Sequence, residues 1–135
     1  MKITILSENT TADERLECEH GLSVLVQMQN AVILFDTGCG GMFIRNAQKL
    51  GIDLAQVTHV ILSHGHYDHA GGIPEFLSMN KTASVYMRKE SLSPVFAVRA
   101  RGEAEYIGVP QELADSNRLV FSRDGMTIAP GVTLY

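Results

Sequence analysis

Residues 63–72 read Ser63-His64-Gly65-His66-Tyr67-Asp68-His69-Ala70-Gly71-Gly72, directly after the apolar segment Val60-Ile61-Leu62. Within them, three imidazoles and one carboxylate fall in six consecutive positions. Neutral imidazole and carboxylate are ligand types that suit zinc, iron and manganese. Residues two apart in extended backbone project to the same side, so His64 and His66 are expected to converge on one ion. The cluster therefore predicts a divalent-metal site at the end of a buried strand.

Asp68 and His69 follow where the chain is expected to bend towards a helix, so they can point to a second position close to the first. Taken singly, these residues have ordinary structural interpretations: His64 as an exposed strand end, and Asp68 as a helix N-cap. Four such groups within six positions favour a metal site over a set of coincidences.

Apolar patterns along the rest of the chain predict strands that alternate with helices. Strands are expected at residues 2–6, 22–28, 31–35, 60–62 and 84–88. One or two more are expected in residues 118–135, broken at Asp124-Gly125 and Pro130-Gly131. Helices are expected at 42–50, at 73–79 and from Ser93-Pro94, with one short capped turn at Asp53. Such alternation is typical of an α/β layered fold.

The composition fits one globular domain and excludes several classes of function. The chain has 135 residues, 45% of them apolar, and a formal net charge of −4. It has no cluster of lysine and arginine, which argues against a nucleic-acid partner. The apolar segment at residues 1–6 ends at Ser7, so it is too short for the core of a signal peptide or for a membrane span. A cytoplasmic location away from membranes is therefore expected. Cys18 and Cys39 are then expected to be free thiols.

Three segments carry a resemblance to a known family. Residues 63–72 resemble the H-x-H-x-D-H signature of metallo-β-lactamase-superfamily hydrolases, and Phe35-Asp36-Thr37-Gly38 resembles the aspartate motif that precedes it. Cys18-Glu19-His20-Gly21-Leu22-Ser23 is similar to the E-H-G-L-S segment of a dihydropterin/ribofuranosylaminobenzene-5′-phosphate-synthase-like subgroup. The resemblance implies half of an αββα sandwich, a mixed sheet flanked by helices. It implies one domain over residues 1–135, truncated at its C-terminal end.

The resemblance also implies roles for individual residues. His64 and His66 would bind a first ion and Asp68 and His69 a second, with zinc expected first and iron or manganese as alternatives. A metal-bound hydroxide, oriented by Asp68, would attack a small-molecule substrate. The second catalytic candidate, Asp36, would accept an N–H from a ligand histidine, or else cap its own turn.

Other polar residues near these motifs are weaker candidates. Glu19 and His20 are candidates for lining the site, whereas His59 is expected to be structural. The segment 99–110 matches no clear pattern and is a candidate substrate-facing loop.

The family pattern continues with two further histidines and a bridging aspartate, but this chain has no histidine after His69. Each ion would then have two protein ligands, where a zinc site usually has three and a water. We therefore expect a C-terminal half or self-association to complete the fold. The chain alone is expected to bind metal weakly and to turn over little.

Two other interpretations remain open. One is a non-catalytic module that binds metal or a partner strand at a sheet edge. The other is a dimeric aspartic protease, because Asp36-Thr37-Gly38 also resembles the D-T-G motif of that class. The protease hypothesis leaves the histidine cluster unexplained. The substrate, the metal and the oligomeric state do not follow from the sequence.

Overall fold

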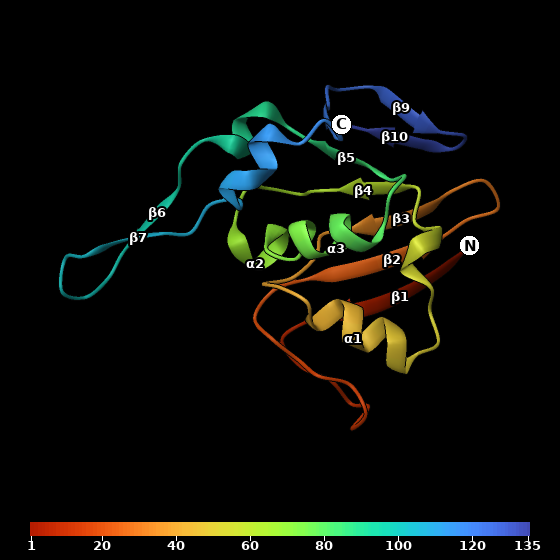
Figure 1. Ribbon diagram of the computed structural model, residues 1–135, viewed down its shortest axis with the longest axis horizontal. Helices are drawn as coiled ribbons and strands as arrows, with labels where there is room; N and C mark the ends of the chain where they lie inside the picture. The colour runs from red at the N-terminus through yellow and green to blue at the C-terminus, as the bar shows by residue number, and fades with distance from the viewer.

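A six-stranded mixed sheet forms the centre of the computed structural model, which describes residues 1–135 (Figure 1). Its strands, in spatial order, are β1 (Lys2–Ser7), β2 (Ser23–Gln27), β3 (Val32–Phe35), β4 (His59–Ile61), β5 (Ser84–Met87) and β8 (Leu119–Phe121). The first three strands pair antiparallel, and β3, β4, β5 and β8 pair parallel. The parallel strands have their carboxyl ends at one edge of the sheet, where ligand sites of open α/β sheets lie.

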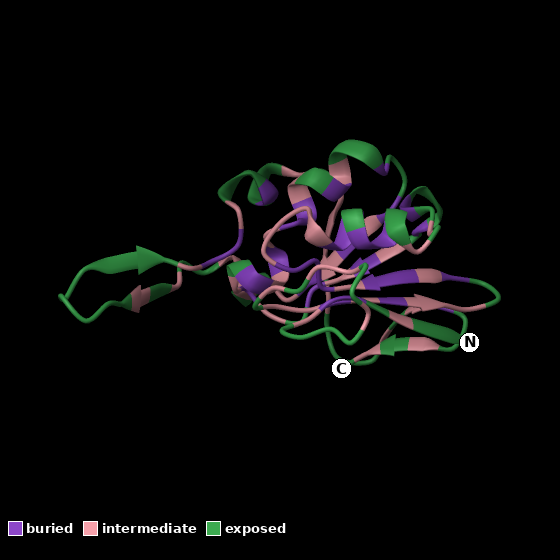
Figure 2. Cartoon of the chain, turned by 90° about the horizontal axis from the view of Figure 1, so that it is seen from below, coloured by how far each residue is buried: buried purple, intermediate pink, exposed green.

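The longer helices cover one face of this sheet (Figure 2). They are α1 (Met42–Lys49) and α3 (Ile73–Met79), and the short α2 (Tyr67–Ala70) precedes α3. Phe43 and Ala47 of α1 and Phe76 of α3 are fully buried against strand residues such as Leu34 and Val60. Three 3₁₀ turns, Leu54–Gln56, Lys89–Leu92 and Gln111–Asp115, connect the elements. No helix combines the length and apolar character needed to cross a bilayer.

Two hairpins extend the sheet domain. The strands β9 (Met126–Ala129) and β10 (Val132–Leu134) pair antiparallel, and Ala129 packs with Ala31 and Ile33 in a small second core. The strands β6 (Phe96–Val98) and β7 (Ala104–Tyr106) form an arm that projects from the body (Figure 2). The segment 99–110 therefore contributes the tip and one strand of this arm.

The predicted α/β fold with a mixed sheet and flanking helices is confirmed, as are the strands predicted before residue 118 and the helices at 42–50 and 73–79. Residues 118–135, expected to form one or two strands, form three. One element is wrong: the helix expected from Ser93-Pro94 is strand β6. Phe96 and Val98 alternate with Ala97, and the Phe96 ring lies edge-on to Tyr106 of β7 at 5.5 Å between centroids. Cross-strand aromatic pairing of this kind stabilises a hairpin, and the cap-like Ser93-Pro94 pair did not reveal it.

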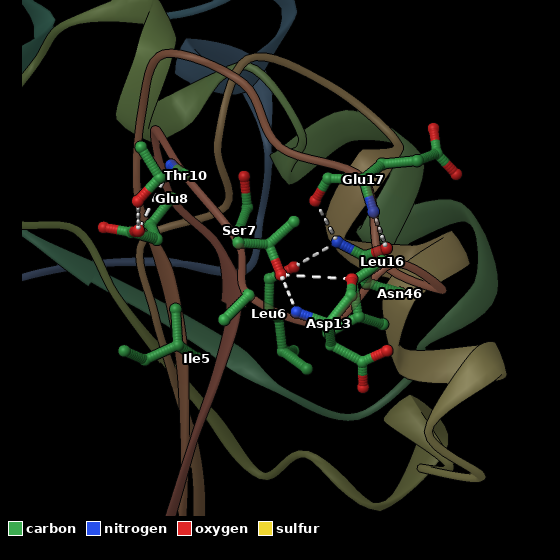
Figure 3. A pocket seen from close by; sticks show the side chains of 11 residues that line it. Ile5, Leu6, Ser7, Glu8, Thr10, Asp13, Leu16, Glu17 and Asn46 are labelled. Atoms are coloured by element: carbon green, nitrogen blue, oxygen red, sulfur yellow. Dashed lines mark hydrogen bonds between the residues drawn. The ribbon is translucent and has the colours of Figure 1, made fainter.

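Asn46 of α1 holds the loop of residues 8–22 against the helix (Figure 3). Its amide donates to the carbonyls of Leu6 (2.7 Å) and Glu17 (2.9 Å), and its Oδ1 accepts from the Glu17 backbone N–H (3.0 Å). A hollow of about 300 Å³ lies beside these contacts and is lined by residues of β1, the loop and α1. It includes no histidine, so the predicted site is elsewhere.

Replacing Asn46 tests this anchor. Asn46→Ala leaves up to three backbone groups without partners, so we expect the free energy of unfolding to fall by about 1–3 kcal/mol. Urea denaturation followed by circular dichroism measures the change. Gln48→Ala, on the exposed side of the same helix, is the matched control and should stay within about 0.5 kcal/mol of the wild type. Equal stability of the two variants would contradict the anchoring role.

Candidate metal centre

The histidine cluster lies on the loop after β4 and on α2. This loop bends at residues 63–65 and does not continue as a strand, although the backbone of His66 is extended (φ −100°, ψ 148°). The two side chains still meet, with His64 Nε2 3.2 Å from His66 Nδ1. The His69 ring lies 4.2 Å from the His64 ring between centroids. The three imidazoles therefore gather at the carboxyl end of β4.

Asp36 joins this cluster from the end of β3. Its side chain is 0% exposed, and its carboxylate accepts from the Ser63 N–H (2.8 Å), the Ser63 hydroxyl (2.7 Å) and His69 Nδ1 (2.7 Å). The predicted contact with a candidate ligand histidine is therefore present. The carboxylate makes none of the turn-capping contacts weighed for it. Its backbone is left-handed, with φ of 56°, a conformation that aspartate tolerates better than most residues.

The Asp36 contacts determine which ring nitrogens are free. His69 Nδ1 must carry a proton to donate to a carboxylate, which leaves its Nε2 as a lone pair. The single proton of the Ser63 hydroxyl goes to Asp36, so Ser63 Oγ accepts from His64 Nδ1 at 2.8 Å, and His64 Nε2 also keeps its lone pair. Sequence reasoning gave Ser63 no role, although it opens the quoted motif.

The two backbone segments are locked together beside the cluster. The Asp36 N–H donates to the Ile61 carbonyl (2.9 Å), and the Thr37 N–H and hydroxyl both donate to the His69 carbonyl (2.7 and 3.0 Å). A Cβ on Gly72 would lie 2.4 Å from the Thr37 carbonyl oxygen, so only glycine allows this approach. The turn after β3 and helix α2 therefore act as one rigid frame.

Asp68 lies in the first turn of α2, where His66 and not Asp68 is the N-cap. Its side chain is 12% exposed, and its Oδ2 lies 3.5 Å from His69 Nε2 and 3.2 Å from His20 Nε2. The structure thus brings the predicted residues His64, His66, Asp68, His69 and Asp36 together. It adds His20, one of the weaker candidates, beside Asp68.

The donor atoms of the cluster fit a divalent cation two at a time. Two ligands about 2.0–2.1 Å from one tetrahedral ion lie about 3.3 Å apart, close to the His64–His66 and Asp68–His69 spacings of 3.2 and 3.5 Å. The Nδ1 atoms of His64 and His69 bond Ser63 and Asp36. Metal-binding histidines usually make such a bond with the ring nitrogen that does not touch the metal. No three histidine, cysteine, aspartate or glutamate side chains are arranged to hold one ion together.

The remaining candidates have structural contacts. His59 bonds Thr58 Oγ1 (2.7 Å) and the Ile128 carbonyl (3.1 Å), so its predicted structural role is confirmed. The Glu19 carboxylate accepts from Ser7 Oγ and the Cys39 N–H, both at 3.1 Å.

Both cysteines are free, as expected. Burial, helped by the carboxylates of Glu19 and Asp68, raises the pKa of the Cys39 thiol to about 11. Cys39 is therefore protonated near neutral pH, and its thiol donates to the His20 carbonyl at 2.9 Å.

Asp36 also bears on the aspartic-protease hypothesis. Such a protease needs an aspartate that can face its twin across a two-fold axis. Asp36 is fully buried, and both carboxylate oxygens are bonded within the chain. This arrangement argues against that hypothesis.

Comparison with known proteins agrees with the geometry. The sequence model of the metallo-beta-lactamase superfamily matches residues 16–133. An uncharacterised protein of Methanocaldococcus jannaschii is 30% identical over 84% of this chain. The 7,8-dihydropterin-6-methyl-4-(beta-D-ribofuranosyl)-aminobenzene-5′-phosphate synthase of the same organism is 29% identical, also over 84% of the chain. The chain spans 42% of the length of each of these two relatives.

A solved structure gives the same fold. It is a metal-dependent hydrolase of the beta-lactamase superfamily, 36% identical, with a TM-score of 0.71 over 93% of this chain and 43% of its own.

The Asp36–His69 contact predicts a tautomer that can be observed directly. In Asp36→Asn the amide can donate to His69 Nδ1, so we expect the ring proton to move to Nε2. Asparagine tolerates the left-handed backbone, which keeps the turn intact. Long-range ¹H–¹⁵N NMR of the metal-free protein reports the tautomer. Asp53→Asn, at an exposed turn, is the control. An unchanged His69 tautomer in Asp36→Asn would show that the carboxylate does not set it.

Titration of His64 gives a second prediction. Burial lowers its pKa below the ordinary 6.5, and repulsion from His69 and His66 lowers it further. Between the folded pKa of His64 and pH 6.5, the unfolded chain binds more protons than the folded chain. The stability contributed by neutral His64 is therefore fully present above pH 6.5 and is lost as the pH falls through this window. With chelator present, we expect NMR to show a titration midpoint of the His64 ring below pH 6.5. In His69→Gln we expect this midpoint to be higher, because one repelling imidazole is gone. A midpoint at or above 6.5 in the wild type would refute this.

Proposed function

Because the chain belongs to the metallo-beta-lactamase superfamily, we propose that it acts as a metal-dependent hydrolase whose divalent ions are held by His64, His66, Asp68 and His69. Zinc is the first choice of metal, with iron and manganese as alternatives that suit the same ligands. The chain spans 42% of the length of the two relatives from Methanocaldococcus jannaschii, so the activity proposed is that of a complete hydrolase to which these residues contribute.

The observation that carries the proposal is the buried Asp36 carboxylate. A fully buried charge is costly unless it is hydrogen-bonded. Both oxygens of this carboxylate accept hydrogen bonds, and all the donors belong to Ser63 and His69. Its effect is to leave a lone pair on His69 Nε2 and, through Ser63, on His64 Nε2, in two rings whose centroids lie 4.2 Å apart. A purely structural carboxylate would have no need to fix the tautomer of two neighbouring imidazoles.

In this proposal each residue has a defined task. A bound divalent ion would supply a water of lowered pKa for hydrolysis. Asp36 and Ser63 position His69 and His64. Asp68, whose Oδ2 faces the cluster, would orient the attacking water and accept its proton. The frame formed by the turn after β3 and α2 keeps these groups from moving apart.

For the substrate, we propose a small phosphorylated molecule rather than nucleic acid. One relative is named as an aminobenzene-5′-phosphate synthase, and this chain is 29% identical to it over 128 aligned residues. The chain is acidic overall, with a net charge of −4, and its sequence has no cluster of lysine and arginine to attract a nucleic-acid backbone. A further polypeptide segment, or a second copy of the chain, would complete the ligand set.

A second candidate function is metal binding without turnover. It is favoured by the absence of any three side chains arranged around one ion, since catalytic zinc usually has three protein ligands. The two candidates differ in one observable, because only the first gives metal-dependent hydrolysis.

Metal content and hydrolysis test both candidates. We expect zinc binding by the wild type in calorimetry and elemental mass spectrometry, and loss of zinc in the double variant His64→Ala/His66→Ala. Asp36→Asn should bind about 10–100-fold more weakly, as outer partners of metal ligands do. His59→Gln, which removes an imidazole outside the cluster, is the control.

Slow hydrolysis of bis(p-nitrophenyl) phosphate that chelator abolishes and zinc restores would support the hydrolase. Zinc binding without hydrolysis would favour the second candidate. A wild type that takes up no zinc would contradict both.

A further inference from the structure

We propose that His20 is a third protein ligand, beside Asp68 and His69, for one divalent cation. The inference rests on the proposed metal-dependent function and extends it to the loop between β1 and β2. His20 lies 48 positions before Asp68 in the chain, so no contiguous motif joins them. Their meeting is a product of the fold.

The spacing of three donor atoms supports the proposal. Asp68 Oδ2 lies 3.2 Å from His20 Nε2 and 3.5 Å from His69 Nε2. Both distances are close to the separation of about 3.3 Å expected between two ligands of one tetrahedral ion. His69 Nδ1 is occupied by Asp36, so the nitrogen that faces Asp68 is the one with a free lone pair.

These contacts are also not aligned hydrogen bonds. Asp36 and His69 show what such a bond looks like here, at 2.7 Å with Nδ1 directed at the carboxylate. The two Nε2 atoms instead lie beside Asp68 Oδ2, at the longer distances of 3.2 and 3.5 Å. Neither Nε2 atom is therefore committed to Asp68 through a hydrogen bond.

The backbone around His20 is fixed on the segment that carries Asp68. The Leu22 N–H donates to the Asp68 carbonyl at 3.3 Å, and the Gly21 N–H donates to Asn9 Oδ1 at 3.1 Å. Gly21 has φ of 134°, and a Cβ there would lie 2.2 Å from the Asp68 carbonyl oxygen. The Cys39 thiol bonds the His20 carbonyl itself. These contacts therefore hold the His20 backbone close to Asp68.

Glu19 explains why this loop stays in place. Its carboxylate joins Ser7 at the end of β1 to the Cys39 N–H in the turn after β3. The same turn contains Asp36, so the loop with His20 is tied to the frame that holds His69. Glu19 is thus a positioning residue for His20, not a group that touches the cluster.

The His20 side chain, unlike its backbone, is free to adjust. It is 74% exposed and lines a polar hollow of about 280 Å³ with Glu8, Asn9, Asp68 and His69. The three donors do not yet surround one point. Rotation of an exposed imidazole about its two side-chain torsions displaces no packed neighbour, so His20 can close onto an ion at little cost.

The experiment follows zinc binding to the 135-residue chain in wild type, His20→Gln and the control His59→Gln. Calorimetry gives affinity and stoichiometry, and long-range ¹H–¹⁵N NMR follows the ring nitrogens of each histidine during the titration. We expect His20→Gln to weaken binding by at least about tenfold. We also expect the wild-type His20 and His69 ring signals to shift together with zinc, while those of His59 stay unchanged.

Unchanged affinity in His20→Gln, with zinc still bound by the wild type, would overturn the role of His20 and leave the proposed metal site standing. Weaker binding without a shift of the His20 ring would also overturn direct ligation, because His20 would then act only through Asp68. A wild type that binds no zinc would overturn the proposed function and this inference with it. Circular dichroism checks that each variant is folded.

Discussion

The buried carboxylate of Asp36 is the constraint on which the candidate site depends. Carrying a charge out of water at the end of β3 is unfavourable unless donors surround it, and Ser63 and His69 supply three. Those donors lie on the segment after β4, so satisfying one carboxylate also fixes the loop and the helix that carry the histidines. The parallel pairing of β3 with β4 makes the arrangement geometrically available, because it places both carboxyl ends side by side.

The site is then assembled from three segments rather than one motif. The turn after β3 brings Asp36, the loop after β4 and α2 bring the histidines and Asp68, and the loop before β2 brings His20. Close backbone contacts at Gly21 and Gly72 join these segments. Stability and chemistry are linked here, because the hydrogen bonds that hold the segments together also decide which ring nitrogens face the cluster.

Local patterns predicted most of the fold but not every element. The buried strands and the helix at 42–50 have strong apolar periodicity, which local sequence controls. Ser93-Pro94 has the chemistry of a helix start, yet the residues after it form β6, because Phe96 pairs with Tyr106 across the hairpin. That partner lies in a segment with no clear pattern of its own. Pairing between strands is a non-local interaction, and one strand read alone does not reveal it.

The sequence by itself determined the superfamily, the alternation of strands and helices, and the residues His64, His66, Asp68 and His69 as candidates for one site. These follow from residue types at short spacing, which the linear chain displays directly. Only the tertiary structure decided that Ser63 connects Asp36 to His64, that Glu19 is an anchor, and that His20 reaches Asp68. These contacts join residues from different segments or depend on a hydroxyl's orientation, and such geometry exists only once the sheet has brought the segments together.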